Sequence, residues 1–206
     1  MLRKSPAEEH GSPHLGFSVV EVLVALAITA LLSAVLIPAI IGKVQDARRS
    51  ALSQTLFALS QGIAEYRKAV TRYPPTLTVL TTPPIAGVTT DLCLGVNFLS
   101  QANVNNWRGP YVSRELLSSG VSMADGVIQN TLRRAVSSTS VFLLIDVAGV
   151  ETRTATDLES DLDGAVSDTA AGTIRFTTGA LPSPATVGSA LPGTVNLSYS
   201  IPIAGC

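Results

Sequence analysis

The chain has 206 residues, of which 46% are hydrophobic and 14% are charged, and its formal net charge is -1. This length accommodates one membrane anchor and one modest globular domain, but not several domains. A nearly neutral chain has no general attraction to nucleic acid or to anionic lipid, which argues against a nucleic-acid-binding protein. The low charge suits an exported protein that packs against copies of itself.

Residues 1–16 form a polar leader with charges of both signs. An ordinary secretory signal has an apolar core of roughly 7 to 15 residues, followed by a small-residue cleavage site. Here the apolar run is longer, and the expected cleavage point precedes it. Cleavage at the Ala-x-Ala pattern of residues 25–27 is the alternative, although it would leave most of the apolar run attached.

Residues 17–42 form an apolar run in which Glu21 is the one ionisable side chain. About 26 residues at about 1.5 Å each give a helix of about 39 Å, enough to cross a bilayer core of about 30 Å. A carboxylate is costly in hydrocarbon unless a cation or hydrogen-bond donors meet it. Cleavage between Gly16 and Phe17 would supply a cation, because an α-amino group has a pKa of about 7.7 to 8.

The new amine at Phe17 and the carboxylate of Glu21 are four residues apart, so they can pair on one face of a single helix. Between staggered helices, the amine of one copy would instead meet the Glu of the next and set their register. Buried ion pairs often fail to stabilise relative to apolar packing, so this role is a hypothesis. The alternative is a plain membrane anchor with Glu21 in the interfacial zone.

This combination of Gly16, Phe17, Glu21 and a long apolar run resembles the processing site of type IV prepilins and of the pseudopilins of type II secretion. In that family a membrane aspartic peptidase cuts after the Gly and methylates the new amine, which corresponds here to Gly16 and Phe17. The family's acidic residue corresponds to Glu21. The chain departs from the common pattern in having His14 and Leu15, rather than a basic residue, just before the Gly.

The resemblance implies a precursor in the bacterial inner membrane, with one span and its head in the periplasm, that is later built into a pilus or pseudopilus. It implies three kinds of protein partner: copies of the chain itself with minor pilins, the prepilin peptidase, and an inner-membrane assembly platform. The corresponding division of the chain is a leader at 1–16, a transmembrane and polymerisation helix at 17–42, and a head at 43–206.

Pro38 and Gly42 interrupt the apolar helix near its end. Proline removes a backbone donor and clashes with the preceding turn, so we expect a bend or a locally melted segment there. The resemblance supports this expectation, since many type IV pilins have a similarly placed Pro. The bend could let a filament stretch, or it could simply steer the head.

Residues 43–72 continue as an amphipathic helix that should end before the Tyr-Pro-Pro sequence at 73–75. This helix exit is similar to that of major pseudopilins. The apolar positions recur at steps of three and four residues: Val44, Ala47, Ala51, Leu52, Leu56, Leu59, Ile63 and Tyr66. Such a stripe needs a sheet to cover it.

Residues 74–110 have little periodicity and form a long connecting region. It ends at residues 107–111, whose sequence resembles the Trp-x-Gly-Pro-Tyr turn of many pseudopilins. The Trp107 ring either closes the turn over the core, which we favour, or contacts a partner.

The remainder of the chain predicts a sheet with short helices. Residues 114–117 and 126–136 are compatible with helical turns, and 157–163 with a short helix. Strands are expected at 141–148, 174–178 and 195–201. A long helix followed by several strands implies an α+β head, in which an antiparallel sheet packs on the helix. The family resemblance implies the same architecture.

Cys93 and Cys206 are the two cysteines of the chain. An oxidising, exported setting favours a disulfide, worth about 4 to 5 kcal/mol in the chain-entropy model, whereas a reducing compartment would leave two thiols. Many type IV pilins are similar in closing a C-terminal loop with a disulfide.

The acidic segment after residue 156 partly fits a calcium loop, with Glu159, Asp161, Asp163 and Asp168 as candidate ligands. The bidentate Glu that should close such a loop is missing, because Ala170 occupies its place. Some pseudopilins bind calcium near the C-terminal end. A solvated helix without metal is the interpretation we favour.

Catalysis is disfavoured by the residues available. Both histidines, His10 and His14, lie in the leader, so the processed chain would lack the commonest general base. The sequence contains no G-x-S-x-G, zinc-type or phosphate-loop motif. Arg133 and Arg134 are too small a cluster for nucleic-acid recognition. Together with the family resemblance, which implies a filament subunit, this leads us to expect no enzyme and no cofactor apart from the calcium considered above; a permanently anchored periplasmic binding domain and a membrane-tethered enzyme are lesser alternatives.

Overall fold

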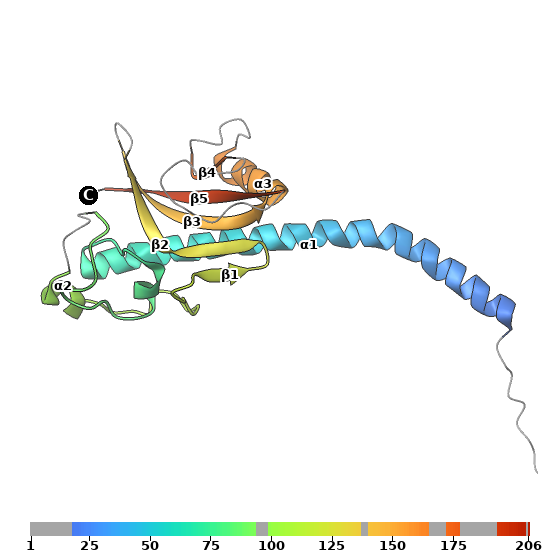
Figure 1. The fold of residues 1–206 in the computed structure, drawn as a ribbon, viewed down its shortest axis with the longest axis horizontal. Helices are drawn as coiled ribbons and strands as arrows, with labels where there is room; N and C mark the ends of the chain where they lie inside the picture. The colour runs from blue at the N-terminus through green and yellow to red at the C-terminus, as the bar shows by residue number, and fades with distance from the viewer. Residues whose placement is uncertain (1–17, 94–98, 137–139, 165–171, 178–192, 205) are drawn as a thin grey trace, which may run out of the picture. The chain divides into compact units, whose positions relative to one another are not determined.

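The computed structural model describes residues 18–93, 99–136, 140–164, 172–177, 193–204 and 206. The chain divides into two compact units, Met1–Val44 and Gln45–Cys206. The second unit is called the head below. Helix α1, Val19–Val70, contributes to both units (Figure 1).

In the first unit, α1 is the one described helix that is long and apolar enough to cross a membrane, as judged by length and composition. Its backbone is helical across Pro38 and Gly42, so the locally melted segment that we considered is not observed. The bend at these residues stays a prediction.

In the head, one face of α1 supplies the centre of the core. The buried positions follow the three- and four-residue spacing of an amphipathic helix: Leu52, Leu56, Leu59, Ile63, Tyr66 and Val70. The predicted stripe is therefore confirmed from Leu52 onward. Its first members, Val44, Ala47 and Ala51, are exposed, so the buried face begins later than predicted.

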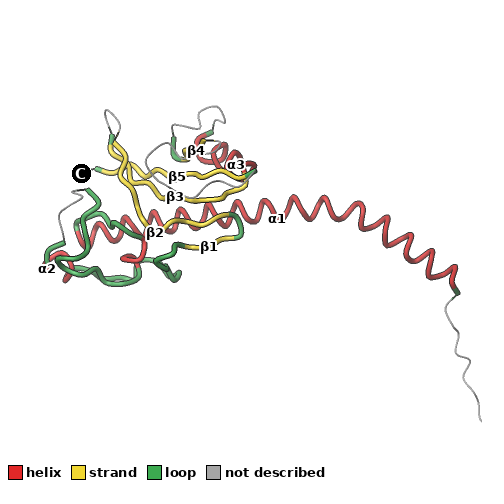
Figure 2. The backbone as a smooth tube through the Cα atoms, in the orientation of Figure 1, coloured by secondary structure: helices red, strands yellow, loops and turns green. Residues whose placement is uncertain are grey.

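A five-stranded antiparallel sheet, in the order β1-β2-β3-β5-β4, completes the head (Figure 1). The strands are β1 Val121–Met123, β2 Gly126–Val136, β3 Val141–Glu151, β4 Ile174–Thr177 and β5 Thr194–Ile203, and helix α3, Thr152–Asp163, lies between β3 and β4 in the chain. The connecting region between α1 and β1, whose described loops are green in Figure 2, contains the 3-10 helix η1 Leu77–Leu80 and the short helix α2 Gln101–Asn105.

Alternation along the strands directs one face of the sheet into the core. Leu143, Ile145 and Val147 of β3 belong to the same buried cluster as the α1 stripe, and Leu158 of α3 joins it. Successive side chains of a strand point to opposite faces, so Asp146 lies on the other face of the sheet. The predicted α+β head, with an antiparallel sheet on a long helix, is confirmed.

Two local predictions were wrong. Residues 126–136 form strand β2 rather than helical turns. Its buried side chains, Ile128 and Leu132, are four residues apart, and this spacing places side chains on one face in a helix and in a strand alike. Residues 114–117 form no helix either, because Leu117 pairs with Gly120 in an isolated β-bridge. The strands expected at 141–148, 174–178 and 195–201 are confirmed for their described residues, as is the helix at 157–163.

Tyr66 generates a prediction about alkaline stability. Its side chain is fully buried, and its hydroxyl has no hydrogen-bond partner among the described residues. Burial raises the pKa of Tyr66 above its ordinary value, and the neighbouring Tyr111 and Asp91 add to the increase. Above pH 10 the folded state therefore binds more protons than the unfolded state, so stability falls as pH rises, by at most about 1.4 kcal/mol per pH unit.

Tyr66→Phe should remove this alkaline loss and leave stability at pH 7 unchanged or increased, because an unpartnered buried hydroxyl costs free energy. Denaturant unfolding of the full chain in detergent, at pH 7 and between pH 10 and 11.5, measures both effects. Equal alkaline slopes for the variant and the wild type would contradict the assignment.

Candidate functional site

The surface of the first half of α1 is apolar on every side. All its large aliphatic side chains with described burial are exposed, from Val19 at 76% to Ile41 at 53%. Soluble monomers rarely expose contiguous apolar surface of this extent, which marks sites of contact with membrane or protein. The first half of α1 is therefore built to be covered by something other than its own head.

The polar groups of this segment are satisfied inside the helix, with one exception. Thr29 Oγ1 donates to the carbonyl of Leu26 at 2.9 Å, and Ser33 Oγ donates to that of Thr29 at 2.7 Å. Such bonds let hydroxyl side chains enter hydrocarbon at low cost. Glu21 is the exception, because it is exposed and forms no ion pair among the described residues.

Glu21 occupies the first turn of α1. Backbone N–H groups in a first turn lack helical acceptors and carry partial positive charge, so this end of the helix stabilises a carboxylate. A full cation nearby would stabilise it further. The predicted cleavage and methylation residues, Gly16 and Phe17, lie outside the described part of the chain, as does the rest of the leader.

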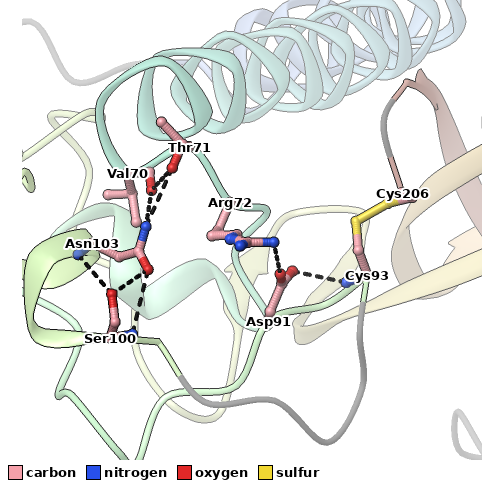
Figure 3. Close-up of polar contacts among 8 residues, drawn as sticks. All are labelled: Val70, Thr71, Arg72, Asp91, Cys93, Ser100, Asn103 and Cys206. Atoms are coloured by element: carbon pink, nitrogen blue, oxygen red, sulfur yellow. Dashed lines mark hydrogen bonds and ion pairs between the residues drawn. A yellow bond between two sulfur atoms is a disulfide. The ribbon is translucent and has the colours of Figure 1, made fainter.

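The other end of α1 is fastened to the connecting region by side chains (Figure 3). Thr71 follows the helix with a left-handed backbone, φ 63°, which is unusual for a β-branched residue. Asn103 Nδ2 donates to the Val70 carbonyl at 3.0 Å and to Thr71 Oγ1 at 3.2 Å. Asn103 is itself held in a capping box with Ser100, so α2 closes the end of α1.

A buried carboxylate links this end of α1 to the disulfide. Asp91 is 3% exposed, accepts from Arg72 Nη1 at 3.2 Å and from the Cys93 backbone N–H at 3.0 Å. Cys93 is bonded to Cys206, across a sequence separation of 113 residues (Figure 3). The structure thus contains the disulfide that the sequence predicted for an exported protein in an oxidising compartment.

The turn at residues 107–111 packs against the head. Trp107 Nε1 donates to the Val79 carbonyl at 3.0 Å, and its ring meets that of Tyr111 edge to face with centroids 5.7 Å apart. A side chain at Gly109 would collide with the Trp107 ring, so a residue without Cβ is required there. These contacts support the packed turn over a partner contact for the Trp107 ring.

The three described calcium candidates, Glu159, Asp161 and Asp163, form no metal-binding group with other described residues. Asp163 accepts from the backbone N–H groups of Thr173 and Ile174, each at 2.8 Å, and so joins the end of α3 to β4. Asp161 faces Arg49, and Glu159 is buried, which differs from the fully solvated helix that we expected. Asp168 lies outside the described residues, which contain no group of three or more His, Cys, Asp or Glu able to hold a metal.

One buried charge pair was missed in the sequence. Arg133 donates to both carboxylate oxygens of Asp146, which also accepts from Ser198 Oγ at 2.6 Å. An Asp inside the apolar run at 141–148 was the available signal, because a buried carboxylate requires a partner. This cluster ties β2, β3 and β5 together on the face of the sheet that points away from the core.

Comparison with known proteins gives a match at the N-terminus. Residues 12–37 match the prokaryotic N-terminal methylation motif, which is the signature of type IV pilins and pseudopilins. The motif implies processing by prepilin peptidase and assembly into a pilin filament in general, and it belongs to structural proteins rather than to an enzyme family. No curated protein and no solved structure matches the chain significantly.

The disulfide should contribute strongly to the stability of the head. Replacing both Cys93 and Cys206 by Ser should lower the free energy of unfolding by about 4 to 5 kcal/mol, because the bridge restricts the unfolded chain over a long loop. Denaturant unfolding of the full chain in detergent, with and without reductant, measures the loss. Reductant should destabilise the wild type equally and leave the double variant unchanged; a loss below about 1 kcal/mol would contradict the prediction.

Proposed function

We propose that this chain, whose N-terminal methylation motif supports a type IV pilin-like or pseudopilin protein, is the structural subunit of a type IV pilus-like filament. The observation that carries the proposal is the first half of α1, where residues 19–41 form an exposed, predominantly apolar helix in which Glu21 is the one ionisable side chain. A membrane covers such a helix in the precursor, and a bundle of identical helices covers it in the filament.

Packing drives the assembly in this proposal. A helix that moves from lipid into a bundle stays in apolar surroundings, so the hydrophobic effect does not favour the bundle over the bilayer. Close side-chain contact and the pairing of polar groups must therefore stabilise the bundle. The aliphatic side chains of Val19–Ile41 provide the contact surface. Glu21 provides the polar group, and the amine of Phe17, exposed by cleavage after Gly16 and then methylated, provides its partner in a neighbouring copy. Their pairing sets the register between the helices.

The precursor in this proposal is a single-pass inner-membrane protein with its head in the periplasm. Prepilin peptidase removes residues 1–16, and an inner-membrane assembly platform transfers the processed subunit into the filament, with minor pilins where the system has them. The mature filament lies in the periplasm as a pseudopilus or extends from the cell surface as a pilus.

A pseudopilin of type II secretion is the main alternative. The Tyr-Pro sequence that follows α1 and the packed turn around Trp107 resemble pseudopilin features, whereas the disulfide to Cys206 resembles the closed C-terminal loop of pilins. A permanently anchored periplasmic binding domain would instead retain the leader and form no polymer, and a membrane-tethered enzyme would keep an activity after removal of the helix. Imaging of sheared cell-surface material with an antibody to the head separates surface pili from a periplasmic pseudopilus.

Glu21→Ala and Glu21→Val should leave cleavage after Gly16 intact and reduce filament yield at least about tenfold, because the amine of the neighbouring copy loses its buried partner. Mass spectrometry of the mature chain reports cleavage, and electron microscopy of sheared material reports filaments. Thr29→Val is the matched control, since the Thr29 hydroxyl bonds only within its own helix among the described residues. Abundant normal filaments from the Glu21 variants, or a mature chain that does not begin at Phe17, would refute this assignment.

A further inference from the structure

A groove lies in the head between the second half of α1 and the end of β5. Its volume is about 420 Å³, and its lining includes Ile63, Arg67, Lys68, Tyr73, Ile201 and Ile203. The floor is apolar, and two cationic side chains stand at its α1 side. All these residues belong to the head unit.

Among the described residues, β4 covers only part of β5, and this leaves the groove open. The two strands pair over Asn196–Tyr199, and the Ser200 N–H donates to the Thr173 carbonyl at 2.7 Å. N–H groups alternate in direction along a strand, so the nitrogen of Pro202 faces the same side as that of Ser200 but carries no hydrogen. This edge therefore resists the addition of another strand, and an occupant of the groove must bind through its side chains.

The groove carries uncompensated positive charge. Arg67 donates to the Ala204 carbonyl at 2.7 Å and stacks on Tyr73, with its guanidinium 4.8 Å from the ring centroid. It forms no ion pair with a carboxylate among the described residues. Lys68, paired with Glu65, is 72% exposed at the rim. An apolar floor beside a guanidinium that has no carboxylate partner among the described residues suits a partner that presents an aliphatic side chain next to an acid.

The C-terminal end of α3, on the same head, presents an aliphatic side chain next to acidic side chains. Arg49 is shared by Asp46, Asp157 and Asp161, at 4.0, 3.9 and 3.4 Å, so three carboxylates surround one cation. Leu162 follows Asp161 in the chain and is 41% exposed. This end of the head therefore offers an exposed aliphatic side chain next to three carboxylates that share one cation.

We propose that heads bind one another head to tail, with Leu162 of one copy in the groove of the next and Asp161 paired with Arg67. The inference rests on the proposed filament function, and it names the surfaces through which neighbouring heads meet. Arg49 and Arg67 are separated by 18 helical residues, about 27 Å along α1, so one head can use both surfaces at once. A contact between two different surfaces generates an open series rather than a closed dimer, as a filament requires.

Charge reversal tests the pairing in the full chain. Arg67→Glu and Asp161→Arg should each lower filament yield at least about tenfold, because like charges then face each other, and the two changes combined should restore it. Lys68→Glu should also lower the yield while leaving the contacts of Arg67 with Ala204 and Tyr73 in place. Arg134→Glu, an equal charge change at an exposed position of β2, should have no effect. Wild-type yields from the single reversals, or no recovery in the combined variant, would overturn the proposal.

Cross-linking separates this inference from the filament function itself. Lys68→Cys and Asp161→Cys copies, mixed in detergent and oxidised, should give a covalent dimer, whereas Arg134→Cys with Asp161→Cys should give at least about tenfold less. A cross-link in detergent, from a chain that gives no filaments in sheared cell material, would support the head contact and refute the filament function. Filaments without the cross-link, under the same oxidation, would refute the head contact alone.

Discussion

The structure depends on an apolar surface that the chain cannot cover by itself. The large side chains between Val19 and Ile41 are exposed, and helical geometry spreads them over the whole circumference of α1. A lipid bilayer or a bundle of equivalent helices satisfies such a segment, and water does not. In the proposed filament, the bundle differs from the bilayer in how it accommodates the acid at Glu21. A neighbouring helix can place a cation beside this carboxylate, whereas the hydrocarbon of the bilayer cannot.

In the head, the rest of the chain covers one face of α1. From Leu52 onward a single stripe of α1 is buried in one cluster with side chains of the sheet and of α3, and the exposed side is mostly polar or small apart from Phe57. The head therefore gains its stability from a conventional amphipathic interface. Asn103, Asp91 and the Cys93–Cys206 bridge then fix the connecting region around the end of the helix.

The sequence predicted the features that depend on residues close together in the chain. The long apolar run and the amphipathic stripe specify α1, and the runs at 141–148 and 195–201 specify two central strands. Strand β2 could not be distinguished from helical turns, because Ile128 and Leu132 satisfy both periodicities. The ion pairs Arg72–Asp91 and Arg133–Asp146 join residues 19 and 13 positions apart, and chain spacing alone does not specify such partners. The groove likewise depends on where β4 begins beside β5, which no pattern in the sequence marks.

The covalent link between Cys93 and Cys206 has a mechanical consequence. In the proposed filament, tension would enter each subunit through α1, upstream of Cys93. The residues between the two cysteines form a closed loop that tension cannot lengthen while the bond is intact. At about 3.5 Å per extended residue, the bond removes roughly 400 Å from the length to which a chain pulled at its two ends can extend, so the segment before Cys93 yields while the strands, all inside the loop, stay folded.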